Sequence, residues 1–120
     1  MAKVLLFNIT GDKKKKLQFL LMQYRIISVE ASPSDCCVPL GKLLGKSGPF
    51  PPATLDAPFP DEMLVLDGLD TQQFHGLLNG MKMLQAQVTY KAVTTEQNLT
   101  WTPARLCREL AAEHAAMQNR

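Results

Sequence analysis

The sequence contains no long hydrophobic run and no large excess of charge of one sign. Its apolar stretches, such as Val4 to Phe7 and Phe19 to Met22, are far shorter than the roughly 20 residues that cross a bilayer. We therefore expect no membrane span and no membrane partner. The 13 basic and 11 acidic residues nearly cancel, and only 7% of the residues are aromatic, none of them interleaved with the lysines. This composition gives no reason to expect nucleic acid as a partner.

Cysteine is scarce and odd in number. Of the three cysteines, Cys36 and Cys37 are neighbours, and a direct disulfide between them would close a strained ring. Zinc sites normally use separated pairs of ligands, whereas Cys107 lies far along the chain with no adjoining ligand. We therefore predict reduced thiols, no metal and no cofactor. Asn8, Asp12 and four lysines interrupt the N-terminal apolar run, which predicts no secretory signal and hence a cytoplasmic protein.

The motifs that carry common enzyme chemistry are also absent. The sequence has no Gly-x-Ser-x-Gly, no His-Glu-x-x-His, no paired-carboxylate motif and no glycine-rich phosphate loop. His75 follows Phe74, and His114 lies near the apolar stripe of the last expected helix, where a histidine is more often packed or solvated than catalytic. We name no catalytic residue. Whether the protein is an enzyme stays open, with the balance toward a non-enzyme.

The chain is long enough for one ordinary domain. With 120 residues, of which 46% are apolar, folding buries roughly 65% of the extended-chain surface, so no disulfide or metal is needed for stability. We therefore predict a single α/β domain over residues 1–120. Residues 31–61 are irregular, with five prolines between Ser47 and Pro60, and we interpret them as a Pro-rich insertion with a long loop.

The first half of the chain predicts a β-α-β unit followed by a short helix. Residues 3–10 form a nearly continuous apolar run, as in a central strand covered on both faces, and residues 25–30 are rich in β-branched side chains. Between them, the spacing i, i+3, i+4, i+7 predicts an amphipathic helix over about 12–24 with Leu17, Leu20, Leu21 and Tyr24. A short helix is predicted between Pro39 and Gly45.

The second half predicts strand, helix, strand and helix. Residues 62–68 form another continuous apolar strand, and Asp70 with Gln73 is an N-cap pair for a helix with the stripe Phe74, Leu77, Leu78 and Met81. Gly76 and Gly80 in this helix indicate a close backbone approach. Residues 87–94 alternate in polarity, which predicts an edge strand. Thr102 and Pro103 open a final helix with the stripe Leu106, Leu110 and Met117.

These elements predict a small four-stranded, mostly parallel sheet of order 2-1-3-4 with helices on both faces. A ferredoxin-like α+β sheet, in which the same two apolar strands are central, is the alternative. The helical segment after the second strand and the continuous apolar strands favour the first architecture.

The segment Lys91-Ala-Val-Thr-Thr95, followed by Asn98-Leu-Thr-Trp101 and a closing helix, resembles the signature of a family of small bacterial proteins of unknown function. Leu66-Asp-Gly-Leu69 and residues 40–45 fit the same family pattern. The resemblance implies an α/β fold and a bacterial origin. It implies no chemistry, because no activity is known for that family.

A ligand site is predicted in the loops after the first, third and fourth strands. In an open parallel sheet, ligands bind beyond the carboxyl ends of the strands, where the strand order reverses. The candidate ligand-binding residues are Asn8, Thr10, Gly11, Asp12, Lys13, Asp67, Gly68, Thr95, Asn98 and Trp101. The lysines after Asp12 oppose the helix dipole, and a bound phosphate would relieve this. Caps and turns use the same residue types, so a purely structural role is the alternative.

Two classes of function remain. The first is a non-enzymatic binding or regulatory module that contacts a protein partner or a second copy of itself. It rests on the long Pro-rich loop with Phe50, Leu55 and Phe59, and on the edge strand at 87–94 as a site of strand addition. The second is a small-ligand or phosphate-binding domain with its site at the strand ends. We place the binding module first.

Overall fold

A computed structural model describes residues 1–118 and divides the chain into two compact units. The sheet unit comprises residues 1–31 and 62–94, and the helical unit comprises residues 32–61 and, of the described C-terminal residues, 95–118. Each unit is therefore built from two segments that are distant in the sequence. The single domain over residues 1–120 stays a prediction.

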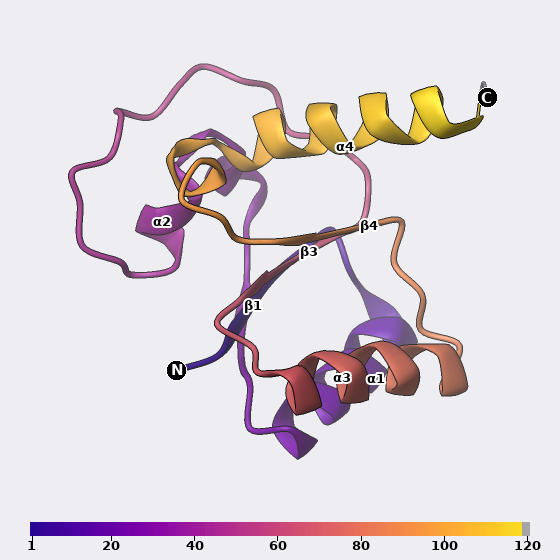
Figure 1. Cartoon of the computed structure of the whole chain (residues 1–120). Helices are drawn as coiled ribbons and strands as arrows, with labels where there is room; N and C mark the ends of the chain where they lie inside the picture. The colour runs from indigo at the N-terminus through magenta and orange to yellow at the C-terminus, as the bar shows by residue number, and fades with distance from the viewer. Residues whose placement is uncertain (119–120) are drawn as a thin grey trace. The chain divides into compact units, whose positions relative to one another are not determined.

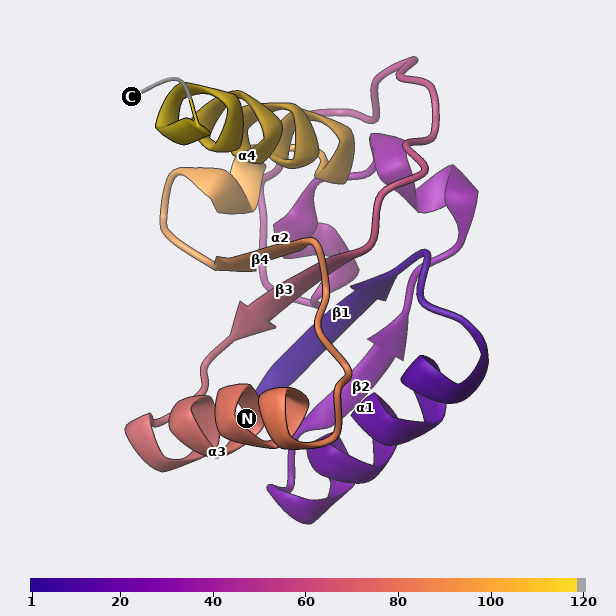
Figure 2. The ribbon, with the colours of Figure 1, turned by 90° about the vertical axis from the view of Figure 1, so that its right-hand side faces the viewer.

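The sheet unit contains four strands in the order β2-β1-β3-β4. They are β1 (Lys3–Phe7), β2 (Ile27–Glu30), β3 (Met63–Asp67) and β4 (Tyr90–Val93). β1 runs parallel to β2, and β3 runs parallel to β4, whereas the central pair β1 and β3 is antiparallel, as the arrowheads in Figure 2 show. The α/β class and the predicted order 2-1-3-4 are confirmed. The sheet is mixed, because one of its three neighbouring pairs is antiparallel.

Burial explains which strands are central. Val4 and Leu6 in β1 and Leu64 and Leu66 in β3 belong to the core of the sheet unit. Side chains alternate between the two faces of a strand, and Val65, on the opposite face from Leu64, is also buried. A strand that is buried on both faces has no polar positions, which is why β1 and β3 read as continuous apolar runs. β2 and β4 are more exposed and form the two edges, so the predicted edge strand in 87–94 is confirmed from Tyr90 onward.

Two helices, α1 (Gly11–Gln23) and α3 (Thr71–Met83), lie side by side on one face of the sheet (Figures 1 and 2). The predicted N-cap of α3 is confirmed, and both of its reciprocal hydrogen bonds are present. Asp70 Oδ1 accepts a hydrogen bond from Gln73 N at 2.7 Å, and Asp70 N donates to Gln73 Oε1 at 3.0 Å. Each helix buries apolar side chains at helical spacing: Leu17, Leu20 and Leu21 in α1, and Leu77 and Met81 in α3.

The predicted close approach at the two glycines of α3 is also present. A Cβ at Gly80 would lie 2.5 Å from Leu20 Cδ2, and a Cβ at Gly76 would overlap the ring of Tyr24. α1 thus places two side chains directly against the backbone of α3. Larger residues at 76 or 80 would force the two helices apart.

The helical unit contains η1 (Pro33–Cys37), α2 (Leu40–Leu43), η2 (Asn98–Thr100) and α4 (Pro103–Gln118). Figure 1 shows the long loop that follows α2 and leads to β3. The predicted N-cap of α4 is confirmed by a 3.2 Å bond from Arg105 N to Thr102 Oγ1. The predicted apolar stripe of α4 is wrong at Met117, which is 69% exposed. The buried residues of α4 lie in its first two turns, and residues 108–117 are partly buried or exposed. Within residues 1–118, every helix is too short or too polar to cross a bilayer.

Candidate functional site

An apolar groove of 220 Å³ lies between α3 and β4 in the sheet unit. Phe74 and Leu78 of α3 form one wall, and the backbone and side chains from Lys91 to Val93 form the other. Leu66 of the neighbouring strand also lines the groove. Phe74 and Leu78 pack against the core of the sheet unit but are only partly buried, so the core covers this part of the apolar face of α3 incompletely.

The groove is open because β4 is the last strand of the sheet. In the register of the parallel pair, Lys91 lies opposite Leu64 and Val93 opposite Leu66, which places both β4 side chains on the face that carries α3. Val93 is 53% exposed. The backbone of an edge strand is a template on which another extended segment can pair.

The opposite edge of the sheet is closed by polar side chains. Lys14 Nζ forms an ion pair with Glu30 Oε1 of β2 at 2.6 Å, and Gln18 Nε2 donates to the same oxygen at 3.1 Å. These contacts connect α1 to β2. The two edges of one sheet therefore differ: one carries a polar cross-link and the other an apolar opening.

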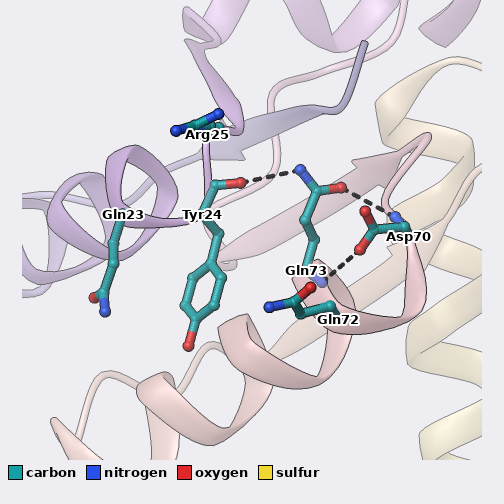
Figure 3. Close-up of a pocket in the computed structure, with 6 residues that line it drawn as sticks. All are labelled: Gln23, Tyr24, Arg25, Asp70, Gln72 and Gln73. Atoms are coloured by element: carbon teal, nitrogen blue, oxygen red, sulfur yellow. Dashed lines mark hydrogen bonds between the residues drawn. The ribbon is translucent and has the colours of Figure 1, made fainter.

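A second pocket, of 340 Å³, lies where the C-terminal end of α1 meets the N-terminal end of α3 (Figure 3). Its lining is polar: Gln23, Tyr24, Arg25, Asp70, Gln72 and Gln73. Figure 3 shows the side chain of Gln73 between the two chain segments. Its Nε2 donates to the carbonyl oxygen of Tyr24 at 3.0 Å, while its Oε1 accepts from Asp70 N. Gln73 thus holds the two sides of the pocket together.

The pocket in Figure 3 brings together groups of opposite charge. Arg25, a non-glycine residue at φ 58°, contributes a guanidinium, and Asp70 contributes a carboxylate. The sequence predicts the cap of Asp70 and Gln73 but not this pocket. The positive φ of Arg25 has no sequence signal, because arginine rarely adopts it.

The loop after β1 does not lie beside the loop after β3. Because β1 and β3 are antiparallel, with Lys3 opposite Asp67 and Phe7 opposite Met63, their carboxyl ends lie at opposite ends of the sheet along the strand direction. The predicted shared ligand site of Asn8 to Lys13 with Asp67 is therefore wrong in its geometry. The expectation assumed a parallel central pair, and the continuous apolar runs of the two strands carry no information on direction.

The residues of the β1 loop have structural roles of their own. Asn8 and Gly11 both adopt positive φ, and Thr10 is the N-cap residue of α1, followed by Asp12 in the first turn. Lys13 Nζ forms a 2.7 Å ion pair with Glu62 Oε1. Binding of a phosphate by these residues stays a prediction.

At the exit of β3, the buried Asp67 accepts a hydrogen bond from Thr94 Oγ1 at 2.7 Å. Gly68 follows at φ 73° and approaches the backbone of Met1, with a Cβ position 3.6 Å from its carbonyl oxygen. These contacts tie β3, β4 and the N-terminus together.

The last three predicted ligand residues belong to the helical unit. Thr95 N donates to Asn98 Oδ1 at 2.7 Å, and Asn98 N donates to Thr95 Oγ1 at 3.0 Å, so the two residues form a reciprocal pair of hydrogen bonds in the turn that leads into η2. The Arg105 guanidinium lies 4.3 Å from the centre of the Trp101 ring, a cation–π contact. A structural role in this turn, the predicted alternative to ligand binding, accounts for these contacts of Thr95 and Asn98.

The three predicted partner-binding residues differ in exposure. Leu55 is fully exposed, whereas Phe50 and Phe59 are partly buried. The Phe50 ring occupies the place that a side chain at Gly41 would take, and Phe59 lines a pocket of 310 Å³ against α4. Phe50 therefore takes part in the packing of the helical unit, and Leu55 is the residue of this set that is open to a partner.

A thiol cluster in the helical unit was not predicted. Cys36 Sγ and Cys37 Sγ lie 3.2 Å apart, and Cys37 Sγ donates to the carbonyl oxygen of Asp56 at 2.9 Å. Burial raises the pKa of the Cys36 thiol to about 11, and the hydrogen bond with Cys37 acts in the same direction. A thiol with this pKa is protonated at neutral pH and is a poor nucleophile. Within residues 1–118, no group of three His, Cys, Asp or Glu residues is placed to hold a metal ion.

The fold and its open edge define a small mixed α/β protein with an apolar surface groove. Residues 62–117 match the model of a family described as a domain of unknown function (DUF3783). The match agrees with the predicted resemblance to an uncharacterised family, while the signature motif and the bacterial origin stay predictions. A search of the curated proteins and a search of the solved structures each found no match.

Proposed function

We propose that the protein is a non-enzymatic binding module of the bacterial cytoplasm that acts through protein–protein contact at the β4 edge. The partner contributes an extended segment that pairs with β4 and inserts an apolar side chain into the groove formed by Phe74, Leu78 and Val93. The observation that carries the proposal is this apolar groove beside an edge strand.

Strand addition supplies two kinds of interaction at this place. Main-chain hydrogen bonds along β4 provide affinity, and a pocket for alternate side chains provides specificity. The groove volume of 220 Å³ is of the right order for one or two apolar side chains. Shielding Val93 and the exposed parts of Phe74 and Leu78 from water stabilises the complex by about 25 cal/mol for each Å² of apolar surface that is buried.

The charge beside the groove indicates the composition of the partner. Lys91 lines the groove and is exposed, with its Nζ donating to the carbonyl oxygen of Val88 at 3.3 Å. A carboxylate next to the inserted apolar residue would replace this long bond with an ion pair. The partner segment therefore has apolar residues at every second position and an acidic residue near them.

The test is a selection of random displayed peptides against the full chain. Peptides with alternating apolar residues and an acidic neighbour should be enriched, and their affinity should fall at least tenfold in Val93→Asp. Ile27→Asp is the matched control, because Ile27 is a 40% exposed aliphatic residue on the other edge strand. Peptides that bind both variants as well as they bind the wild type would refute the proposal.

Self-association is a separate outcome of the same variants. If sedimentation shows a concentration-dependent dimer of the wild type that Val93→Asp abolishes and Ile27→Asp does not, the occupant of the groove is a second copy of the chain. The proposed foreign partner would then be wrong.

The polar pocket of Figure 3 supports small-ligand binding as a second candidate function. Arg25 and Asp70 offer a guanidinium and a carboxylate within one pocket, a combination that suits a small zwitterion with an amino and a carboxylate group. The test is thermal unfolding with a panel of amino acids. A ligand at a hundred times its dissociation constant adds about 2.7 kcal/mol and raises the midpoint by several degrees, and this shift should vanish in Arg25→Ala.

A further inference from the structure

The same series of elements occurs twice along the chain. The order from β1 to α2 is strand, helix, strand, 3₁₀ helix, helix, and the order from β3 to α4 is the same. When 60 is added to each residue number, Lys3–Phe7 becomes Met63–Asp67 and Gly11–Gln23 becomes Thr71–Met83. The first strand and the first helix of the two series therefore agree in length and spacing to the residue.

The local backbone agrees at the same offset of 60. Asn8 and Gly68 both adopt positive φ after the first strand, at 61° and 73°. Arg25 and Gln85 both adopt positive φ after the helix, at 58° and 56°. The bonds that end the helix also correspond, since Ile26 N donates to Leu21 O as Ala86 N donates to Met81 O, both at 2.8 Å.

An offset of 63 relates the parts that follow. It converts the strand Ile27–Glu30 into Tyr90–Val93 and the first residue of α2, Leu40, into the first residue of α4, Pro103. One turn hydrogen bond at the start of these two segments matches as well. Ser32 N donates to Asp35 Oδ2 at 2.8 Å, and Thr95 N donates to Asn98 Oδ1 at 2.7 Å. The longer loop between α3 and β4 accounts for the three additional residues.

Strand pairing in the sheet unit has the register of a two-fold axis. Leu5 lies opposite Val65, its own equivalent at the offset of 60, and the pairs on either side are reciprocal. Lys3 lies opposite Asp67, and Phe7 lies opposite Met63, so position 3 of each copy meets position 7 of the other. This reciprocity is the property of an isologous interface between two like subunits.

The helical unit shows the same reciprocity within itself. α2 of the first series contacts η2 of the second, and α4 of the second series contacts η1 of the first. Each unit thus contains one half from each series. A chance resemblance of two β-α-β segments would not extend to the helical unit, where elements of the first series contact elements of the second.

From these relations we infer that residues 1–61 are a second copy of the module that the family model matches at 62–117, and that the two copies are each other's partner. The chain is a covalent dimer of this module. Between positions 3 and 26 and their equivalents, only Leu6/Leu66 and Leu17/Leu77 are identical, which hides the duplication in the sequence. The inference does not depend on the proposed function.

The two helices meet at a second self-equivalent pair. Leu20 of α1 contacts the backbone of α3 at Gly80, and 20 and 80 are equivalent positions. Two leucines there would collide, because a Cβ at Gly80 already lies 2.5 Å from Leu20 Cδ2, and two glycines would leave a cavity. The pair has one large and one small member. The two copies have therefore diverged so that each packs against the other copy and not against a copy identical to itself.

Exchange of residues in the full chain tests the two-fold relation. Leu20→Gly alone should lower the thermal midpoint by about 10–20 °C, because it opens a cavity and adds a helix glycine, and Gly80→Leu alone should lower it by overpacking. The double variant Leu20→Gly with Gly80→Leu should regain at least half of the loss, since a two-fold axis places the leucine from α3 where the leucine from α1 had been.

The control is the other side-chain-to-glycine contact of the same helices. Tyr24 lies against Gly76, but 24 and 76 are not equivalent positions, because the equivalents of Tyr24 and Gly76 are Leu84 and Lys16. Tyr24→Gly with Gly76→Tyr should therefore remain strongly destabilised. If a single variant does not fold, the two double variants alone decide. Recovery at 20 and 80 that is no greater than recovery at 24 and 76 would overturn the inference.

Discussion

Lys14 and Glu30 form a 2.6 Å ion pair at the β2 edge, at the positions that Phe74 and Val93 occupy at the β4 edge. The offset of 60 relates 14 to 74, and the offset of 63 relates 30 to 93. Gln18, which also donates to Glu30, corresponds to Leu78. The polar cross-link and the apolar groove are thus two versions of one place in the repeated module.

This correspondence predicts that the groove can be closed by transplanting the cross-link. A triple variant of Phe74→Lys, Leu78→Gln and Val93→Glu should fold, because the same three residues are accommodated beside β2, and should lose binding of the selected peptides. The free energy of unfolding should fall by no more than about 3 kcal/mol, since the replaced side chains are only partly buried. Titration calorimetry with one selected peptide measures the loss.

The reverse exchange at the β2 edge is its control. Lys14→Phe, Gln18→Leu and Glu30→Val should open a second groove and raise the peptide stoichiometry from one toward two. Unchanged stoichiometry together with retained binding in the closed variant would show that the groove is not the binding surface.

Tyr24 and Gly76 give a prediction about helix packing. Gly76→Ala improves helix propensity by about 1 kcal/mol on an exposed helix. Here it should destabilise the protein, because the new Cβ overlaps the Tyr24 ring. In a Tyr24→Leu background the same substitution should become neutral or stabilising. Urea unfolding of the four proteins of this cycle measures the coupling between the two positions, and additive effects would contradict the contact.

Much of the fold was predictable because the local sequence patterns agree with which residues are buried in the folded protein. The Asp70 and Gln73 cap, the apolar stripe of α1 and the exposed edge strand β4 each have a pattern that one physical cause produces. The strand order was predictable since continuous apolar runs identify the two central strands.

The direction of the central strands and the binding surface were not predictable. Leu5 and Val65 lie in runs that are buried on both faces, and such runs look the same in a parallel and an antiparallel pair. The long segment between β2 and β3 permits either direction. Phe74 and Leu78 have the spacing of core residues, and only the position of the last strand shows that they are partly uncovered.

Cys36 should be the least reactive thiol of the cluster. Its pKa of about 11, raised by burial from 9.0, lowers its thiolate fraction at pH 8 by about a hundredfold. Iodoacetamide labelling followed by mass spectrometry should therefore modify Cys37 before Cys36 in the native protein. In denaturant the two rates should become equal. Faster native labelling of Cys36 than of Cys37 would contradict the buried thiol.

Asp56 should make the helical unit sensitive to acid. The hydrogen bond from Thr54 lowers the pKa of the Asp56 carboxyl below 3.8, and the Arg108 guanidinium, 3.3 Å from Oδ1, lowers it further. Because the folded-state pKa is below the unfolded value, the contribution to stability is complete well above pH 4 and is lost as the pH falls through the folded-state pKa.

Asp56→Asn should lower the thermal midpoint at pH 7, and the difference from the wild type should shrink steadily below about pH 4. Arg108→Gln is the matched control, since it removes the cation and leaves the Thr54 bond in place, and it should reproduce part of the loss at pH 7. A wild-type to Asp56→Asn difference that stays constant from pH 7 down to pH 2 would show that the ionised carboxylate does not stabilise this unit.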